Sequence, residues 1–174
     1  MTTLYVGGDD SNHAGTSKGE IIVATFSTYK DDSIIRPFPN RRDMQKVQDW
    51  LKMPETDYRF AILTTEQYRH SNENLVEIAP QITLSYIKER GFNLEKLNIY
   101  LDGRLQPRGR DSVKETISKE ISIDQIVVDN FIKKKGRAQR CPHLVYCADV
   151  ISNYLYSQKS FEELSRDPRL VLIK

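Results

Sequence analysis

The order of apolar segments along the chain constrains the fold more than any other feature of the sequence. Runs of β-branched and apolar residues typical of strands come first, and later runs alternate with stretches whose apolar residues recur every three or four positions, as in helices. The predicted strands are 4–6, 20–27, 57–65, 97–102 and 126–132, and the predicted helices are 43–52, 72–90, one from 111, one from 142 and one at 161–164.

Three strands followed by alternating helices and strands predict a mixed sheet. The first three strands can pair in an antiparallel meander, whereas later strands joined by helical crossovers run parallel. Crossover helices cover both faces of such a sheet. We therefore predict an α/β fold with five strands, three antiparallel and then parallel, with helices on both faces and one domain spanning residues 1–174.

Two helix boundaries can be predicted from local signals. Pro80 falls inside the helix at 72–90 and should kink or divide it, because proline removes a backbone hydrogen bond. Ser112 and Glu115 have the spacing of a capping box, which predicts that a helix opens near Asp111.

Composition excludes several classes of protein. Hydrophobic residues make up 39% and charged residues 29% of 174 residues, as in ordinary globular proteins. No apolar run approaches the roughly 18 residues of a membrane span, and no leader precedes the first strand, so we expect no membrane segment and a cytoplasmic location. Cys141 and Cys147 fit neither a disulfide framework nor a zinc knuckle. Phosphate-loop, dinucleotide-binding, hydrolase-elbow and zincin motifs do not occur in the sequence.

Three aspartates stand where two predicted strands end. Gly7-Gly8-Asp9-Asp10-Ser11 looks like a polar turn after the first strand, and Asp102 ends the fourth. In the predicted sheet these two strands are central neighbours, so their ends can bring the carboxylates together. Crowded carboxylates repel unless a cation lies between them, and Mg2+ or Mn2+ prefers such oxygen ligands. Each aspartate taken singly fits an ordinary turn equally well.

Asp149 interrupts a helical stretch that is otherwise suited to pack on a sheet. A carboxylate is costly to bury without a partner, and binding a metal from the helix would remove that cost. A salt bridge to a nearby Arg or Lys, or exposure on the outer face, would explain Asp149 as well. The predicted metal ligands are thus Asp9, Asp102 and Asp149, with Asp10 as an additional catalytic residue.

Two segments resemble the ribonuclease H-like superfamily. Gly8-Asp9-Asp10-Ser11 resembles the Asp-Glu-Ala-Gly or Asp-Glu-Ser-Gly strand end of type 2 ribonucleases H, which a large uncharacterised ribonuclease H-like family shares. The stretch from His143 to Ile151 resembles the closing helix of that family, where Leu-Gln-Leu-Ala-Asp-Leu-Ile supplies the last acidic residue.

The resemblance implies roles for the four aspartates. Asp9 matches the first metal-binding aspartate, Asp10 the acidic position after it, Asp102 the acid of the fourth strand and Asp149 the acid of the helix. The chain departs from the pattern in having Asp10 where Glu is usual. Asn12-His13-Ala14-Gly15 also replaces the Gly-Arg-Gly segment with which type 2 ribonucleases H sense the substrate 2′-hydroxyl. Preference for RNA–DNA hybrids is therefore not implied.

Basic residues are concentrated in one run although the net charge is only +2. Such runs can bind nucleic-acid phosphates, and an exposed loop that keeps a protein soluble is an equally good explanation. The predicted nucleic-acid-binding residues are Lys133, Lys134, Lys135, Arg137 and Arg140, with Arg104, Arg108 and Arg110 as a second group. His13 could assist proton transfer beside Asp9 and Asp10, although an exposed loop position is the favoured interpretation. His70 indicates no specific role, His143 is interpreted as a surface residue at a helix start, and Asp129 as an outward-facing strand residue.

These patterns favour a Mg2+- or Mn2+-dependent phosphodiesterase that acts on nucleic acid. Two bound ions would activate water and stabilise the leaving oxygen, so no protein nucleophile is required. The alternative is a catalytically inactive ribonuclease H-like module that binds nucleic acid or a protein partner. A scaffold without any affinity for nucleic acid is the third hypothesis.

Overall fold

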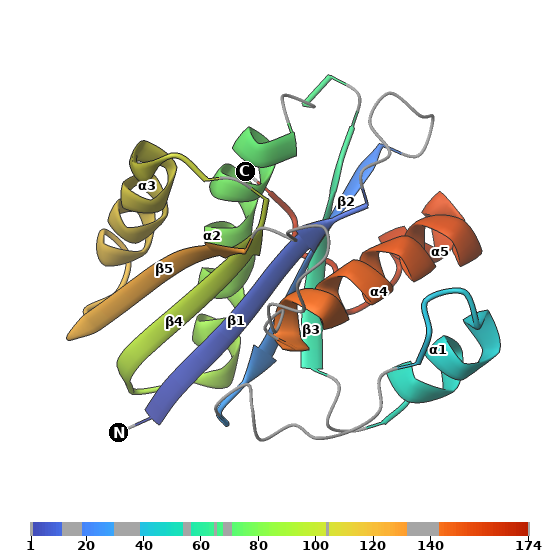
Figure 1. Cartoon of the computed structure of the whole chain (residues 1–174), viewed down its shortest axis with the longest axis horizontal. Helices are drawn as coiled ribbons and strands as arrows, with labels where there is room; N and C mark the ends of the chain where they lie inside the picture. The colour runs from blue at the N-terminus through green and yellow to red at the C-terminus, as the bar shows by residue number, and fades with distance from the viewer. Residues whose placement is uncertain are drawn as a thin grey trace, which may run out of the picture.

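The computed structural model describes residues 2–11, 19–29, 39–53, 57–64, 66–67, 71–103, 105–131 and 143–173. Strands and helices follow one another in the predicted order (Figure 1). The strands are β1 (Thr2–Asp10), β2 (Glu20–Ser27), β3 (Asp57–Leu63), β4 (Leu94–Asp102) and β5 (Gln125–Phe131). The helices are α1 (Met44–Leu51), α2 (Ser71–Arg90), α3 (Pro107–Ser118), α4 (His143–Gln158) and α5 (Phe161–Ser165).

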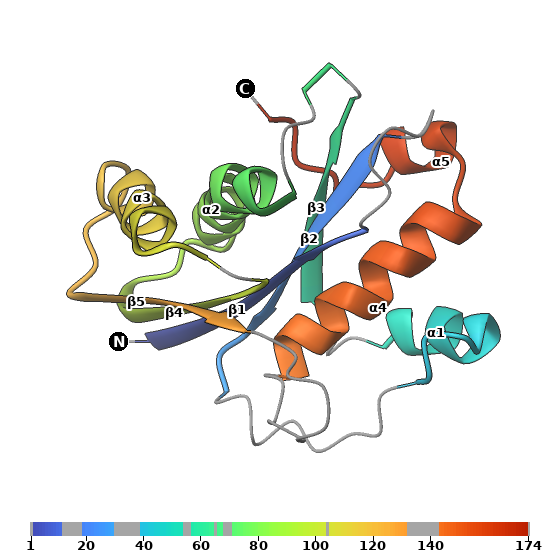
Figure 2. The same ribbon diagram turned by 45° about the horizontal axis from the view of Figure 1, so that its top comes forward.

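The predicted mixed sheet is confirmed. Its strand order is β3-β2-β1-β4-β5, and β1 lies at the centre. β2 pairs antiparallel with β1 and β3, whereas β4 pairs parallel with β1 and β5. Figure 2 shows α2 and α3 on one side of the sheet and α4, with α1 and α5 beyond it, on the other. Helices therefore cover both faces, as expected.

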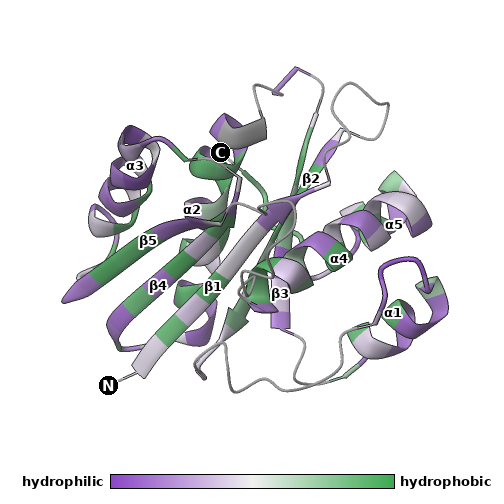
Figure 3. Ribbon diagram, in the orientation of Figure 1, coloured by the Kyte–Doolittle hydropathy of each residue, from purple (hydrophilic) through white to green (hydrophobic). Residues whose placement is uncertain are grey.

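Each face of the sheet has its own hydrophobic core. Leu4, Val6 and Ile22 pack toward α2 and α3, whereas Val23 and Phe60 pack toward α4. Figure 3 shows hydrophobic residues along the strands and many hydrophilic residues on α1 and α3. Because neighbouring strand residues point to opposite faces, membership of a core reveals the face to which a side chain points.

The predicted ends of two elements were wrong. β1 continues to Asp10, so Gly7 to Asp10 are strand residues and not a turn. Pairing with both β2 and β4 extends the strand over these polar positions. α3 opens at Pro107 and not at Asp111. Proline suits the first helical position because its φ angle is fixed near the helical value and no N–H is needed there.

Pro80 does not divide α2, which runs as one helix through it. Leu75, Ile78 and Ile82 on the same helix are almost fully buried against the sheet. Their burial stabilises the helix by several kcal/mol, at about 1.5–3 kcal/mol for each side chain. That gain outweighs the roughly 3 kcal/mol that proline costs inside a helix.

No helix in the part of the chain that the structure describes has the length and hydropathy needed to cross a lipid bilayer.

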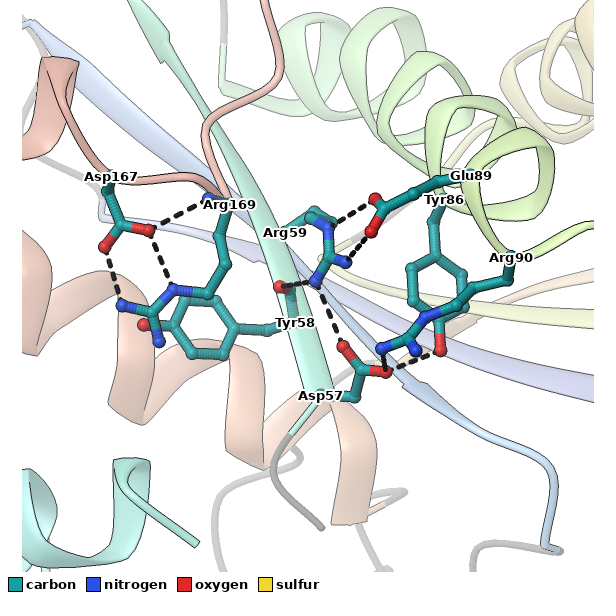
Figure 4. A network of polar contacts seen from close by, with 8 residues as sticks. All are labelled: Asp57, Tyr58, Arg59, Tyr86, Glu89, Arg90, Asp167 and Arg169. Carbon is teal, nitrogen blue, oxygen red and sulfur yellow. Dashed lines mark hydrogen bonds and ion pairs between the residues drawn. The ribbon is translucent and has the colours of Figure 1, made fainter. Parts of the chain in front are cut away.

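An ion-pair network fastens β3 to the last turn of α2 (Figure 4). The Asp57 carboxylate accepts hydrogen bonds from the Tyr86 hydroxyl at 2.7 Å, from Arg90 at 2.8 Å and from Arg59 at 3.1 Å. Arg59 also binds the Glu89 carboxylate through two nitrogens, at 2.6 and 3.0 Å. Arg59 pairs with Ala24, which belongs to the core under α2 and α3, whereas Asp9 pairs with Val23 of the core under α4. The network therefore lies on the opposite face of the sheet from Asp9, and we interpret it as a structural feature.

We expect Asp57→Ala to destabilise the fold by about 2–4 kcal/mol, because it removes charge-assisted hydrogen bonds and leaves the partly buried Tyr86 hydroxyl without its acceptor. Urea unfolding of the purified protein measures this loss. Asp49→Ala is the matched control, since Asp49 is exposed and pairs with the exposed Lys52. It should change the free energy of unfolding by less than about 0.5 kcal/mol. Equal effects of the two variants would contradict the interpretation.

Candidate active site

Asp9 and Asp102 lie side by side on the face of the sheet that α4 covers. Asp9 pairs with Val23, which belongs to the core under α4. Asp102 follows Leu101, which points to the opposite core, so Asp102 points toward the α4 side. Gly8 pairs with Leu101 in the parallel β1–β4 ladder, and the next residue on each strand is the aspartate. The strand register thus brings these two side chains together.

Asp149 lies on α4, which packs directly on the backbone of β1, the strand that carries Asp9. A side chain at Gly7 would come within 2.2 Å of the Leu144 carbonyl carbon, so only glycine permits this approach. Further along α4, the Ser152 hydroxyl donates a hydrogen bond to the carbonyl oxygen of Asp10 in β1 at 3.1 Å. Asp149 lies one helical turn before Ser152, and only 7% of its surface is exposed.

Burial and three neighbouring acids shift the pKa of Asp9. Asp9 is 2% exposed. Burial is the main cause that raises its pKa well above the usual value, and the charge of Asp102 is the next. The charges of Asp149 and Asp10 raise the pKa further, whereas the hydrogen bond from the Asp10 N–H to Asp9 Oδ1 lowers it. Ionised Asp9 is therefore costly, and a nearby cation would relieve that cost.

Asp10 points to the other face of the sheet. It pairs with Ile22, which belongs to the core under α2 and α3. The buried Glu20 lies on the same face and accepts a hydrogen bond from Asn74 of α2 at 2.8 Å. Burial raises the pKa of the Glu20 carboxyl. The register thus separates the Asp10 side chain from the other three acids, and its predicted catalytic role stays a prediction.

Among the described residues, no three His, Cys, Asp or Glu side chains form a group that could hold a metal ion as they stand. The Arg41 guanidinium lies 3.6 Å from Asp149 Oδ2, and the Asn153 amide donates to Asp149 Oδ1 at 3.1 Å. The donor set is nevertheless suited to Mg2+ or Mn2+, because it consists of hard carboxylate oxygens around an Asp9 that is costly to ionise. The chemistry of the residues fits such an ion.

The remaining predicted residues lie partly outside the described part of the chain. The basic run with Lys133, Lys134, Lys135, Arg137 and Arg140 lies outside the described residues, as do Arg104, His13, His70 and Cys141. His143 begins α4, as expected, but it is half-buried and not fully on the surface, and Cys147 is a buried free thiol. Asp129 is exposed on β5, as predicted.

Sequence reasoning missed three residues that contact these acids: Arg41, Ser152 and Asn153. Asn153 stands four positions after Asp149 in a predicted helix, and that spacing places the two side chains on one face. The contact between Asn153 and Asp149 could therefore have been predicted from the sequence. No sequence pattern indicates that Arg41, more than one hundred positions before Asp149, would approach it.

Comparisons with known proteins identify the fold. Ribonuclease H2 from Pyrococcus horikoshii OT3 superposes with a TM-score of 0.55 and 15% sequence identity, over 95% of this chain and 82% of that one. This likeness shows the ribonuclease H-like fold. It does not single out the family with the Leu-Gln-Leu-Ala-Asp closing helix, so that resemblance stays a prediction.

Two further solved structures are more distant. Ribonuclease HII in its complex with PCNA from Archaeoglobus fulgidus gives a TM-score of 0.48 at 13% identity, over 95% of this chain and 82% of that one. The Mn-soaked terminase nuclease domain of human cytomegalovirus gives 0.36 at 12% identity, over 90% and 83%. No protein-family model and no curated protein matches the sequence.

Proposed function

We propose that this protein is a metal-dependent phosphodiesterase that cleaves nucleic acid. The observation that supports the proposal is that Asp9 and Asp102 end neighbouring central strands, while α4, which carries the nearly buried Asp149, packs on β1. Burial next to the charges of Asp102 and Asp149 makes ionised Asp9 costly, so the arrangement has little structural value. A ribonuclease H-like fold with acids at this point is consistent with nuclease chemistry.

Asp9, Asp102 and Asp149 would hold Mg2+ or Mn2+. When bound, such ions supply an activated water and stabilise the negative charge that develops on the phosphate. The residues of the chain provide the oxygen ligands. The Asp10 N–H and the Asn153 amide orient the carboxylates of Asp9 and Asp149. Asp10 would assist through its charge.

The basic run before α4 would bind the nucleic acid next to the site. Lys133, Lys134, Lys135, Arg137 and Arg140 would bind backbone phosphates, because the run immediately precedes the helix that carries Asp149. We further propose that residues 1–174 act as a single domain in the cytoplasm.

Incubation of the purified protein with labelled single-stranded DNA, duplex DNA and RNA–DNA hybrid, with Mg2+, Mn2+ or chelator, tests this function. We expect cleavage of at least one substrate with metal and none with chelator. Isothermal titration with Mn2+ should detect binding that Asp102→Asn weakens. Absence of both cleavage and Mn2+ binding would overturn the proposal.

The alternative function is an inactive module that binds nucleic acid. One specific observation favours it: a protein cation, Arg41, already lies beside Asp149. In that case nucleic-acid affinity would survive both chelator and Asp9→Asn, and no substrate would be cleaved.

A further inference from the structure

Arg41 is the one cation that the described part of the structure places against the acids of the site. Its guanidinium lies 3.6 Å from Asp149 Oδ2. That distance allows an ion pair but is too long for a good hydrogen bond. The Arg41 side chain is 54% exposed, whereas the Asp149 side chain is 10% exposed. A long, mostly solvated arginine thus covers the solvent side of an enclosed carboxylate.

The backbone that carries Arg41 is held firmly beside α4. The Asp43 N–H donates to the Asn40 carbonyl at 2.8 Å, and the Arg42 N–H donates to the Asn40 side chain at 3.0 Å. Val47 and Trp50 of α1 are buried in the same core as the apolar face of α4. The turn before α1 therefore presents Arg41 at the rim of the site, while the side chain stays free to change its direction.

We propose that Arg41 is a phosphate-binding residue of the site, which Asp149 holds in place until a metal ion and nucleic acid bind. The inference rests on the proposed function. Asp149 would lose its attraction for Arg41 when it held a divalent ion, and the guanidinium would then be available to bind the non-bridging oxygens of a phosphate. A planar guanidinium suits this task because it can donate two parallel hydrogen bonds.

Arg41 has two expected effects that can be separated by binding measurements. In the absence of nucleic acid Arg41 competes with the metal, so Arg41→Gln should tighten Mn2+ binding by about two- to fivefold, the range for a partly exposed ion pair. With a metal present Arg41 binds phosphate, so Arg41→Gln should weaken nucleic-acid binding by about tenfold or more. The dependence of affinity on salt should fall by the equivalent of about one phosphate contact.

The experiment uses the full chain with two probes. Mn2+ is titrated by electron paramagnetic resonance, and a fluorescent duplex DNA and its single strand are titrated in Ca2+, followed by anisotropy. Lys52→Gln is the matched control, since it removes one exposed positive charge from the end of α1, where Lys52 pairs with Asp49 at 3.3 Å. Arg41→Lys keeps the charge and loses the planar fork, so it should restore Mn2+ affinity to the wild-type value and nucleic-acid affinity only in part.

Arg41→Gln that matches Lys52→Gln in nucleic-acid affinity would overturn the proposal, and so would full rescue by Arg41→Lys. Failure of the proposed function would look different, because the wild-type protein would then bind no Mn2+ and cleave no substrate. If the glutamine variant does not fold, the lysine variant alone decides between a planar contact and simple charge.

Discussion

Asp9→Asn should abolish metal-dependent cleavage and at the same time stabilise the metal-free protein. If Asp9 is a metal ligand as proposed, its loss removes several kcal/mol of transition-state stabilisation, or about 10^2–10^4-fold in rate. The stability gain follows from the raised pKa of Asp9, whose main causes are burial and the charge of Asp102. An asparagine keeps the oxygen that accepts the Asp10 N–H but carries no charge.

The raised pKa of Asp9 determines how the free energy of unfolding changes with pH. The pKa of Asp9 is raised in the folded chain, so its contribution to stability is fully present below the unfolded value and is lost as pH rises through the folded value. At pH 8 the free energy of unfolding of Asp9→Asn should exceed that of the wild type, because the variant carries no buried charge at this position. At pH 4 the difference should shrink.

Asp129→Asn is the matched control for this prediction. Asp129 is exposed on β5, and its carboxylate accepts the N–H of Asn130, which an asparagine can also do. Neither cleavage nor urea unfolding should change beyond about 0.5 kcal/mol. If Asp9→Asn were less stable than the wild type at pH 8, the acids would not repel one another as inferred.

Gly7→Ala should destabilise the protein by more than about 4 kcal/mol, because α4 lies on the backbone of β1 at this position. The new methyl group would stand 2.2 Å from the Leu144 carbonyl carbon and 2.4 Å from the Val145 nitrogen. Backbone atoms of a helix cannot move singly, so the whole helix must shift. Since α4 carries Asp149, we expect cleavage to be lost together with stability.

Gly109→Ala is the control with the same chemical change. Gly109 is in α3, where a methyl group would come 3.3 Å from a Val76 side-chain carbon, a contact that a small shift relieves. Alanine also favours the helix by up to about 1 kcal/mol over glycine. Urea unfolding and circular dichroism compare the two variants. A Gly7→Ala protein with wild-type stability would show that α4 does not lie so close to β1.

The order of strands and helices followed from the sequence because periodicity is a local property. Alternation in β2 and three- to four-residue spacing in α2 are visible in short windows, and the rules for connecting strands then leave few sheet topologies. The residue types at Asp9, Asp102 and Asp149 could be singled out for the same reason. Each interrupts or ends an apolar run.

Which acids share a face was decided by the tertiary structure. Asp9 and Asp10 are adjacent in sequence, and only the register against Val23 and Ile22 shows that they point to opposite faces. The persistence of α2 through Pro80 likewise depends on burial of distant residues. The ion pair of Arg41 with Asp149 joins two positions that no local pattern connects. Contacts between remote segments depend on how whole elements pack, and that information is not contained in any short stretch of the chain.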